Sequence, residues 1–222
     1  MPRPLVLFDL DGTLVDTLPD IARALGDALA EIGVAPPALD VVKRMVGDGA
    51  RQLVRRARAG RPDDPAEEDA LLARFLASYR AQVCVASRLY QGAREALAGL
   101  RAGGAALAVV TNKPGDLARA LLTTLNAAAE LDEIIGDGDG FPRKPDPTAA
   151  RALLARFGST PETTAIVGDG LPDMRLARAL GATAVAATWG YVPAADLAAE
   201  SPTHLADSLE AAARFVRAAL SR

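Results

Sequence analysis

Two carboxylates near the start of the chain are spaced so that both could act on one substrate. Asp9 and Asp11 follow the short apolar run 5–8, and Gly12 continues into a turn. Residues i and i+2 of an extended backbone point the same way, so both carboxylates can face one reacting centre. One could attack a phosphorus atom while the other donates a proton to the leaving oxygen and later activates water. The spacing therefore favours phosphoryl transfer.

Later apolar segments are followed by residues that suit the same chemistry. Thr111 and Asn112 end one segment, Asp169 and Asp173 follow another, and Lys144 precedes a helical pattern. Several carboxylates would repel a phosphate ester, and a hard cation such as Mg²⁺, which prefers carboxylate and carbonyl oxygens, removes that repulsion. A lysine and a threonine hydroxyl would stabilise the phosphoryl oxygens. We therefore expect a magnesium cofactor.

Each of these motifs alone has a simpler interpretation. Asp-Gly after a strand is usually only a turn, and Thr-Asn often begins a helix. Lys-Pro-Asp-Pro can be only a helix start, and Gly-Asp-Gly is a frequent loop sequence. The functional interpretation rests on all four occurring in this order at the ends of strands in one sheet.

The elements that must position these residues alternate between strand and helix after Gly92. Apolar strands are predicted at 5–8, 106–111, 133–135, 164–167 and 183–187, with helices at 93–100, 116–125, 146–157 and 173–180. Such alternation predicts a parallel sheet covered on both faces, that is, an α/β fold with a Rossmann-like, doubly wound core. Ligands of such sheets bind beyond the carboxyl ends of the strands.

Residues 16–90 show helical rather than alternating periodicity. Apolar residues recur at helical spacing from Leu18 to Ile32, and the pattern resumes in later stretches separated by Pro-rich and Gly-rich breaks. We predict a core domain of residues 1–15 and 91–222 with an all-helical cap domain, residues 16–90, inserted after the first strand.

The ordered motifs resemble the haloacid dehalogenase superfamily, and the inserted helices resemble its type-1 cap. The matching residues are Asp9-Leu-Asp11-Gly-Thr13, Thr111-Asn112, Lys144-Pro-Asp, and Gly168-Asp169 with Asp173. The resemblance implies that Asp9 is a nucleophile that forms an aspartyl-phosphate. It implies that Asp11 is the general acid and base.

The resemblance also implies the cofactor site. Mg²⁺ would be held by Asp9, by the backbone carbonyl of Asp11 and by Asp169, with Asp173 supporting that site from behind.

The remaining motif residues would contact phosphate. By resemblance, Thr111 and Asn112 hold the transferring phosphoryl group, and Lys144 neutralises charge on the nucleophile and the phosphate.

Segments between the motifs resemble phosphoglycolate phosphatases, such as Thr188-Trp-Gly-Tyr191 and the cap segment 46–50. The implied substrate is 2-phosphoglycolate. A sugar-phosphate mutase or a broader phosphatase, pyrophosphatase or nucleotidase shares the core motifs and remains an alternative. A phosphate-ligand-binding regulatory protein is the non-enzymatic alternative. The second carboxylate, Asp11, argues against a dehalogenase or a phosphonate hydrolase.

Selectivity among phosphate esters must come from the cap, because every substrate shares the phosphate. Gly47, Asp48 and Gly49 could form a loop that bends toward the site. Arg51, followed by two arginines at helical spacing, could meet a substrate carboxylate, although a solvated helix face is the favoured interpretation.

Composition restricts partners and location. The 222 residues are 50% hydrophobic and 24% charged, with a formal net charge of −3, which gives no global attraction for nucleic acid or anionic membrane. Cys84 is the single cysteine, the start lacks an apolar signal core, and no stretch is long enough to span a membrane. We expect a cytoplasmic monomer or homodimer whose partner is a small phosphorylated metabolite.

Lysine is rare in this arginine-rich chain. Only Lys43, Lys113 and Lys144 occur, and the last two lie in or beside motifs. Trp189 and Tyr191 follow a strand and are expected either to line the site or to pack within a loop.

Overall fold

The computed structural model describes residues 2–58 and 60–220, which contain a six-stranded parallel sheet. The strands lie in the order β5-β4-β1-β6-β7-β8, and every neighbouring pair is parallel. Their bounds are β1 (Leu5–Phe8), β4 (Ala106–Pro114), β5 (Glu133–Asp137), β6 (Thr164–Gly168), β7 (Thr183–Ala187) and β8 (His204–Ala206). The predicted doubly wound core is confirmed.

Strand β1 lies where the direction of strand addition reverses. β4 and then β5 add on one side of β1, whereas β6, β7 and β8 add on the other. In such sheets the ligand crevice opens beyond the carboxyl ends of the strands at this reversal. Asp9 directly follows β1 and therefore lies at that crevice.

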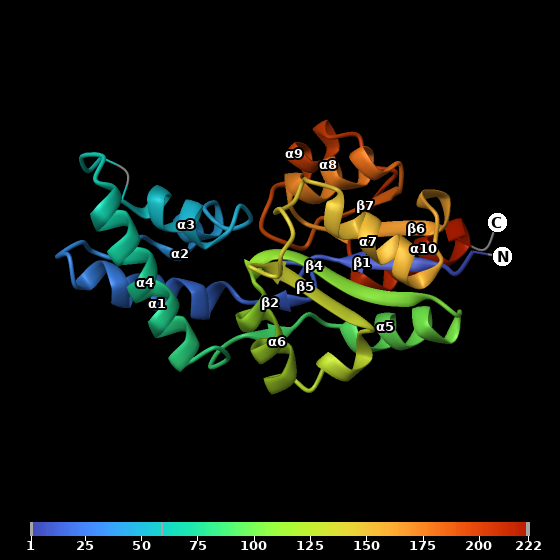
Figure 1. Ribbon diagram of the computed structural model, residues 1–222, viewed down its shortest axis with the longest axis horizontal. Coiled ribbons are helices and arrows are strands. Elements are labelled where there is room, and N and C mark those ends of the chain that lie inside the picture. Colours follow the sequence, from blue (N-terminus) through green and yellow to red (C-terminus); the bar gives the residue numbers. More distant parts are fainter. Residues whose placement is uncertain (1, 59, 221–222) are drawn as a thin grey trace.

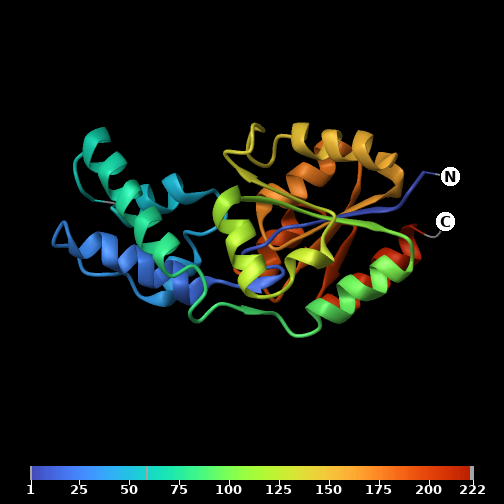
Figure 2. The same ribbon diagram turned by 60° about the horizontal axis from the view of Figure 1, so that its bottom comes forward.

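Helices cover both faces of the sheet (Figure 2). Val6 and Phe8 of β1 pack into one hydrophobic cluster, and Leu5 and Leu7 pack into another, because successive strand residues point to opposite faces. The first cluster includes α5 (Ala93–Ala102), α6 (Gly115–Thr124) and α10 (Leu209–Leu220); the second includes α7 (Thr148–Phe157), α8 (Leu171–Leu180) and α9 (Ala194–Ala199). Short 3-10 turns occupy Ala128–Glu130 and Pro161–Thr163.

The helical block, which comprises α1 to α4, lies as a separate group at one end of the molecule (Figure 1). Its helices are α1 (Leu18–Ala30), α2 (Leu39–Lys43), α3 (Ala50–Ala57) and α4 (Pro65–Ala81). They bury a hydrophobic cluster of their own. Helix α4 begins where Asp64 caps the backbone N–H groups of Ala66 and Glu67, with Pro65 as its first residue. No helix among the described residues is long and apolar enough to cross a membrane.

The chain enters and leaves the helical block through two short strands that were not predicted. β2 (Val15–Asp16) pairs antiparallel with β3 (Arg88–Leu89). Residues 16–90 were predicted to be helical throughout; β2 and β3 were not predicted because a two-residue strand has no periodic pattern to detect. Strand β8 and helices α9 and α10 were also not predicted.

Asp20, in the first turn of α1, ties the start of the helical block to its end. Its carboxylate accepts hydrogen bonds from the backbone N–H groups of Val85, Ala86 and Ser87 at 2.8–3.2 Å, and from the Ser87 hydroxyl at 2.6 Å. Burial raises the pKa of the Asp20 carboxyl, but the hydrogen bonds outweigh burial and hold that pKa below its usual range. The ionised carboxylate therefore stabilises the folded protein.

Replacing Asp20 with Asn should lower the free energy of unfolding by about 3 kcal/mol at pH 7, because buried N–H groups lose a charged acceptor. A lowered folded-state pKa means that this contribution is present above the unfolded pKa of about 3.9 and is lost as pH falls through the folded pKa. Urea unfolding should thus show a smaller loss at pH 3 than at pH 7. Asp40→Asn, at an exposed pair with Arg44, is the control and should cost about 0.5 kcal/mol or less. An equal loss at both pH values would contradict the account.

Candidate active site

Three buried carboxylates and one ammonium meet beyond the ends of β1 and β6. Carboxylate oxygens of Asp9, Asp169 and Asp173 lie within 4.8 Å of one another. The Nζ atom of Lys144 lies 2.8 Å from Asp9 Oδ1 and donates to Asp173 Oδ1 at 2.6 Å. Asp9 Oδ1 also accepts from the backbone N–H of Leu10 at 2.7 Å. Within the described chain, Oδ2 is therefore the Asp9 oxygen with no hydrogen-bond donor.

Asp169 is held in a fixed orientation by the loop after β1 and by the loop after β7. Its Oδ1 accepts from the Thr13 hydroxyl and its Oδ2 from the backbone N–H of Tyr191, both at 2.7 Å. A Cβ atom on Gly12 would lie 2.3 Å from Asp169 Oδ2, and one on Gly190 would lie 2.2 Å from Asp169 Cβ. Glycine is therefore needed at both positions for the backbone to approach the carboxylate this closely.

Asp173 lies in the first turn of α8. Its Oδ2 accepts from the backbone N–H of Gly170 at 3.0 Å, and its other oxygen is bound to Lys144. The helix N-terminus favours a negative charge at this position. The carboxylate thereby orients the lysine that contacts Asp9.

The charges of the cluster fit a divalent cation. Three carboxylates and one ammonium leave two negative charges when all are ionised (three minus one). Burial, together with the charge of Asp9, raises the pKa of Asp169 to about 8. Burial also raises the pKa of Asp173 to about 7, against the opposing effect of Lys144. A divalent ion would compensate both charges, and a donor set made only of oxygen suits Mg²⁺.

The side chain of Asp11 points to a second ammonium group. Asp11 Oδ1 accepts from the Thr17 hydroxyl at 2.8 Å and from Lys113 Nζ at 3.0 Å. Its carboxylate is not part of the three-carboxylate group, so any contact with the cation would fall to its backbone carbonyl. Lys113 also donates to the hydroxyl of Tyr79, on α4, at 2.7 Å.

Thr111 and Asn112, at the end of β4, differ in how they present their polar atoms. Thr111 Oγ1 accepts from the backbone N–H of Lys113 at 3.2 Å, which leaves its own O–H to donate. The Asn112 amide donates to the carbonyls of Gly47 and Lys144 at 3.1 and 3.3 Å, and accepts from the Lys144 N–H at 2.9 Å. A phosphate contact by the Asn112 side chain would require one of the two donated bonds to open.

A cavity of about 40 Å³ lies between the cluster and the helical block. It is lined from the sheet side by Asp9, Asp11, Thr111, Asn112, Lys113, Pro114 and Leu117 of α6, and from the helical block by Ile21, Val46, Gly47, Gly49, Ala50, Leu53, Phe75 and Tyr79. A volume of this size holds a few water molecules. The block is therefore closed over the site.

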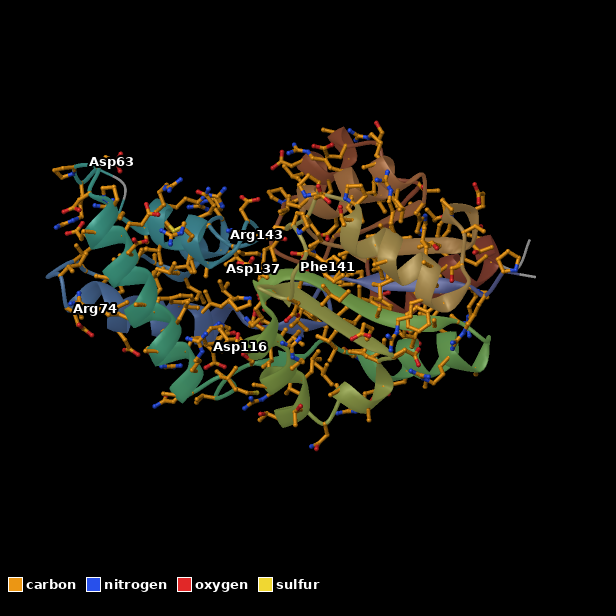
Figure 3. The ribbon with its side chains drawn as sticks, viewed as in Figure 1. Asp63, Arg74, Asp116, Asp137, Phe141 and Arg143 are labelled. Atoms are coloured by element: carbon orange, nitrogen blue, oxygen red, sulfur yellow. The ribbon has the colours of Figure 1, made fainter. Side chains whose placement is uncertain are left out.

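The predicted loop Gly47-Asp48-Gly49 makes this closure. The backbone carbonyl of Asp48 accepts from Arg143 Nη1 at 3.3 Å, and Arg143 Nε lies 3.3 Å from Asp137 Oδ1. Figure 3 shows Arg143 and Asp137 near the junction of the helical block and the sheet. A Cβ atom on Gly49 would lie 2.8 Å from Arg143 Nη1. The Asp48 carboxylate turns away to Arg56.

The structure does not bring Arg51 to the cavity. Its guanidinium donates to Asp69 at 2.6 Å and to Glu68 at 3.0 Å, both on α4. Arg55 and Arg58 likewise pair with glutamates of α4. The arginine row, for which a solvated helix face was favoured over a carboxylate site, thus pairs with acids of α4.

Tyr191, which was expected either to line the site or to pack within a loop, bonds to the start of the helical block. Its hydroxyl accepts from the backbone N–H groups of Thr17 and Leu18 at 2.8 and 3.0 Å, and donates to Asp16 Oδ1 at 3.1 Å. Its backbone holds Asp169, as described above. Tyr191 therefore connects the carboxylate cluster to the start of the helical block. Its neighbour Trp189 donates to the carbonyl of Thr13 at 3.0 Å, so both aromatics pack on the site loops.

Comparisons with known proteins agree on one family. The sequence profile of the family described as haloacid dehalogenase-like hydrolase matches residues 6–187. A phosphoglycolate phosphatase of Rhodospirillum rubrum is 46% identical over 153 residues, which cover 66% of this chain and 63% of that protein. A phosphoglycolate phosphatase of Pseudomonas putida is 44% identical over 154 residues, which cover 67% and 56%. The chain thus spans less than two thirds of the length of these curated relatives.

Solved structures share the whole architecture. The crystal structure of a predicted phosphoglycolate phosphatase from Haemophilus somnus has a TM-score of 0.88 and 31% identity, and the match covers 96% of this chain and 97% of that one. The structure of a putative phosphoglycolate phosphatase from Lactobacillus delbrueckii has the same TM-score at 23% identity and covers all of both chains. At that lower identity the likeness shows the fold alone.

Proposed function

Because this chain belongs to the haloacid dehalogenase-like hydrolase family, we propose that it is a Mg²⁺-dependent phosphatase of small phosphate monoesters, with 2-phosphoglycolate as its substrate. The observation that carries the proposal is the ion pair between Asp9 and Lys144, which lies beside the buried carboxylates of Asp169 and Asp173. The names of the R. rubrum and P. putida relatives support the choice of substrate.

The reaction is proposed to proceed in two steps on Asp9. Asp9 Oδ2, which has no hydrogen-bond donor among the described residues, attacks phosphorus, and the bond from phosphorus to the alcohol oxygen breaks. Asp11 gives its proton to the leaving oxygen. Asp11 then takes a proton from water, which attacks phosphorus, releases inorganic phosphate and restores the Asp9 carboxylate.

Asp9, Asp169 and the backbone carbonyl of Asp11 would hold Mg²⁺. Asp173 would support this site without binding the ion directly. When bound, the ion supplies charge that compensates the carboxylates and the phosphate. Lys144 orients Asp9 through the contact between its ammonium and Asp9 Oδ1, and the Thr111 hydroxyl donates to a phosphoryl oxygen. Asn112 positions Lys144 through the backbone bonds that its amide makes.

Residues 16–90 are proposed to act as a cap domain. Closure of the cap over a cavity of about 40 Å³ would exclude bulk water and restrict the leaving group to a few atoms. The closed form therefore favours an ester with a small leaving group.

A panel of small phosphate esters, assayed with and without Mg²⁺, tests the proposed function. The protein treated with a chelator should lose more than about 99% of its activity, and added Mg²⁺ should restore it, because the carboxylate cluster would otherwise repel the phosphate. Inorganic phosphate should be released fastest from 2-phosphoglycolate.

Other outcomes of the same assay point to other functions. Transfer of phosphate between sugar hydroxyls without net release would indicate a mutase. Binding of phosphate esters without turnover of any of them would indicate a regulatory protein.

A further inference from the structure

Lys113 is a buried ammonium that the proposed reaction steps do not use. It follows Asn112 in β4, it is 5% exposed, and it lines the same cavity as Asp9. Its Nζ atom lies 3.0 Å from Asp11 Oδ1, donates to the Tyr79 hydroxyl at 2.7 Å, and lies 4.3 Å from the centre of the Tyr79 ring. Lys113 thus joins the core to the helical block inside the closed cavity.

Lys113 is the one cation among the described residues that line this cavity. The helical block contributes a mainly apolar wall there, which includes Ile21, Leu53 and Phe75. A negatively charged group on the leaving alcohol would find no other positive partner on this side. Arg51 and Arg55 of α3 are paired with acids of α4, and none of these residues lines the cavity.

The Lys113 ammonium and the Tyr79 hydroxyl each have a hydrogen left to donate. The ammonium has three N–H groups; one serves Tyr79, and one can serve the two oxygens of Asp11. The Tyr79 oxygen accepts from Lys113, which leaves its O–H without an acceptor among the described residues. Two donors held about one hydrogen bond apart match the two oxygens of a carboxylate.

We propose that Lys113 and Tyr79 form a subsite for a carboxylate on the leaving group of a small phosphate ester. The inference rests on the proposed phosphatase function, and it assigns substrate selectivity to these two residues rather than to Arg51. In the absence of substrate Lys113 is paired with Asp11, and a bound carboxylate shares that ammonium. Substrate binding would thereby weaken the ion pair between Lys113 and Asp11, the proposed general acid.

The subsite is tested by comparing 2-phosphoglycolate with ethyl phosphate, which has a methyl group in place of the carboxylate. The parent protein should prefer 2-phosphoglycolate in kcat/KM by about 30-fold or more, as expected for hydrogen bonds to a charged group. Lys113→Met should reduce the preference to within about threefold, and Tyr79→Phe should reduce it in part. Rates on both esters will fall in Lys113→Met because Asp11 loses its partner, so the ratio is the readout.

Lys43→Met is the matched control, because Lys43 is half-buried on α2 and does not line the cavity. Its preference should equal that of the parent. The subsite would be overturned if Lys113→Met kept the preference for 2-phosphoglycolate over ethyl phosphate, or if Arg51→Ala lost it.

Calorimetric binding to Asp9→Asn protein separates failure of the subsite from failure of the proposed function. In that background Lys113→Met should weaken 2-phosphoglycolate binding by about 30-fold and ethyl phosphate binding much less. Binding with this pattern but no turnover by the parent protein supports the subsite and overturns the phosphatase proposal. If the parent protein turns over 2-phosphoglycolate but Lys113→Met weakens binding of both esters equally, the subsite is overturned and the phosphatase proposal stands.

Discussion

Replacement of Asp9 with Asn should lower kcat for phosphate-ester hydrolysis by at least about 10⁴-fold, because an amide cannot act as the nucleophile. The substitution keeps the shape of the side chain and removes one negative charge from a cluster that holds three carboxylates and one ammonium. Lys144 keeps its bond to Asp173. The loss is therefore expected in the chemical step rather than in folding.

Thermal unfolding separates these two effects. The Asp9→Asn protein should unfold at the same temperature as its parent or higher in the absence of Mg²⁺, because the variant has less buried charge repulsion. Single-turnover measurements should show bound ester that is not cleaved. A variant that cleaves the ester within tenfold of the parent rate would contradict the assignment of Asp9.

Replacement of Lys144 with Met should damage both activity and stability. Burial lowers the pKa of Lys144, but Asp173 and Asp9 outweigh burial and raise that pKa above its usual range, so the ammonium is charged at neutral pH. Its removal leaves buried carboxylates without their cation, which should cost about 3–5 kcal/mol of unfolding free energy. We also expect kcat to fall about 10²–10³-fold, because the charge on phosphate and nucleophile is no longer neutralised.

The pH dependence of this stabilisation follows from the raised pKa. The contribution of Lys144 is fully present below the unfolded-state pKa of lysine, about 10.4, and is lost as pH rises through the folded pKa. Urea unfolding of parent and variant should therefore differ throughout the range from about pH 6 to 9. Lys43→Met, on the half-exposed α2, is the control and should change stability by about 0.5 kcal/mol or less. A Lys144→Met protein as stable as this control would contradict the role of the buried pair.

The core of the site could be predicted because parallel strands end at the same edge of a sheet. Asp9, Thr111 and Asp169 each follow an apolar segment, and the alternation of strands and helices is enough to bring such positions together. The register of β1 between β4 and β6 then fixes their distances. Local sequence patterns were thus enough to predict where in the fold the carboxylate cluster lies.

Contacts between the helical block and the core could not be predicted in this way. Tyr79 fits the apolar periodicity of its helix, so nothing local indicates that its hydroxyl meets Lys113. Tyr191 binds the first turn of α1 from a loop near the other end of the chain. Arg51 has a spacing that suits a substrate contact, but its partner depends on how α3 packs against α4. Such pairs depend on tertiary packing, which sequence periodicity does not contain.

The most direct test of the central claim is to trap the phosphoryl group on Asp9. An Asp11→Asn protein should still be phosphorylated by acetyl phosphate with Mg²⁺, because acetate leaves without a proton donor, whereas hydrolysis of the intermediate should be slow without a general base. Mass spectrometry of the acid-quenched protein should find one phosphoryl group, located on Asp9. The double variant that also carries Asp9→Asn should acquire none. A phosphoryl group on another residue, or equal labelling of the double variant, would contradict the account.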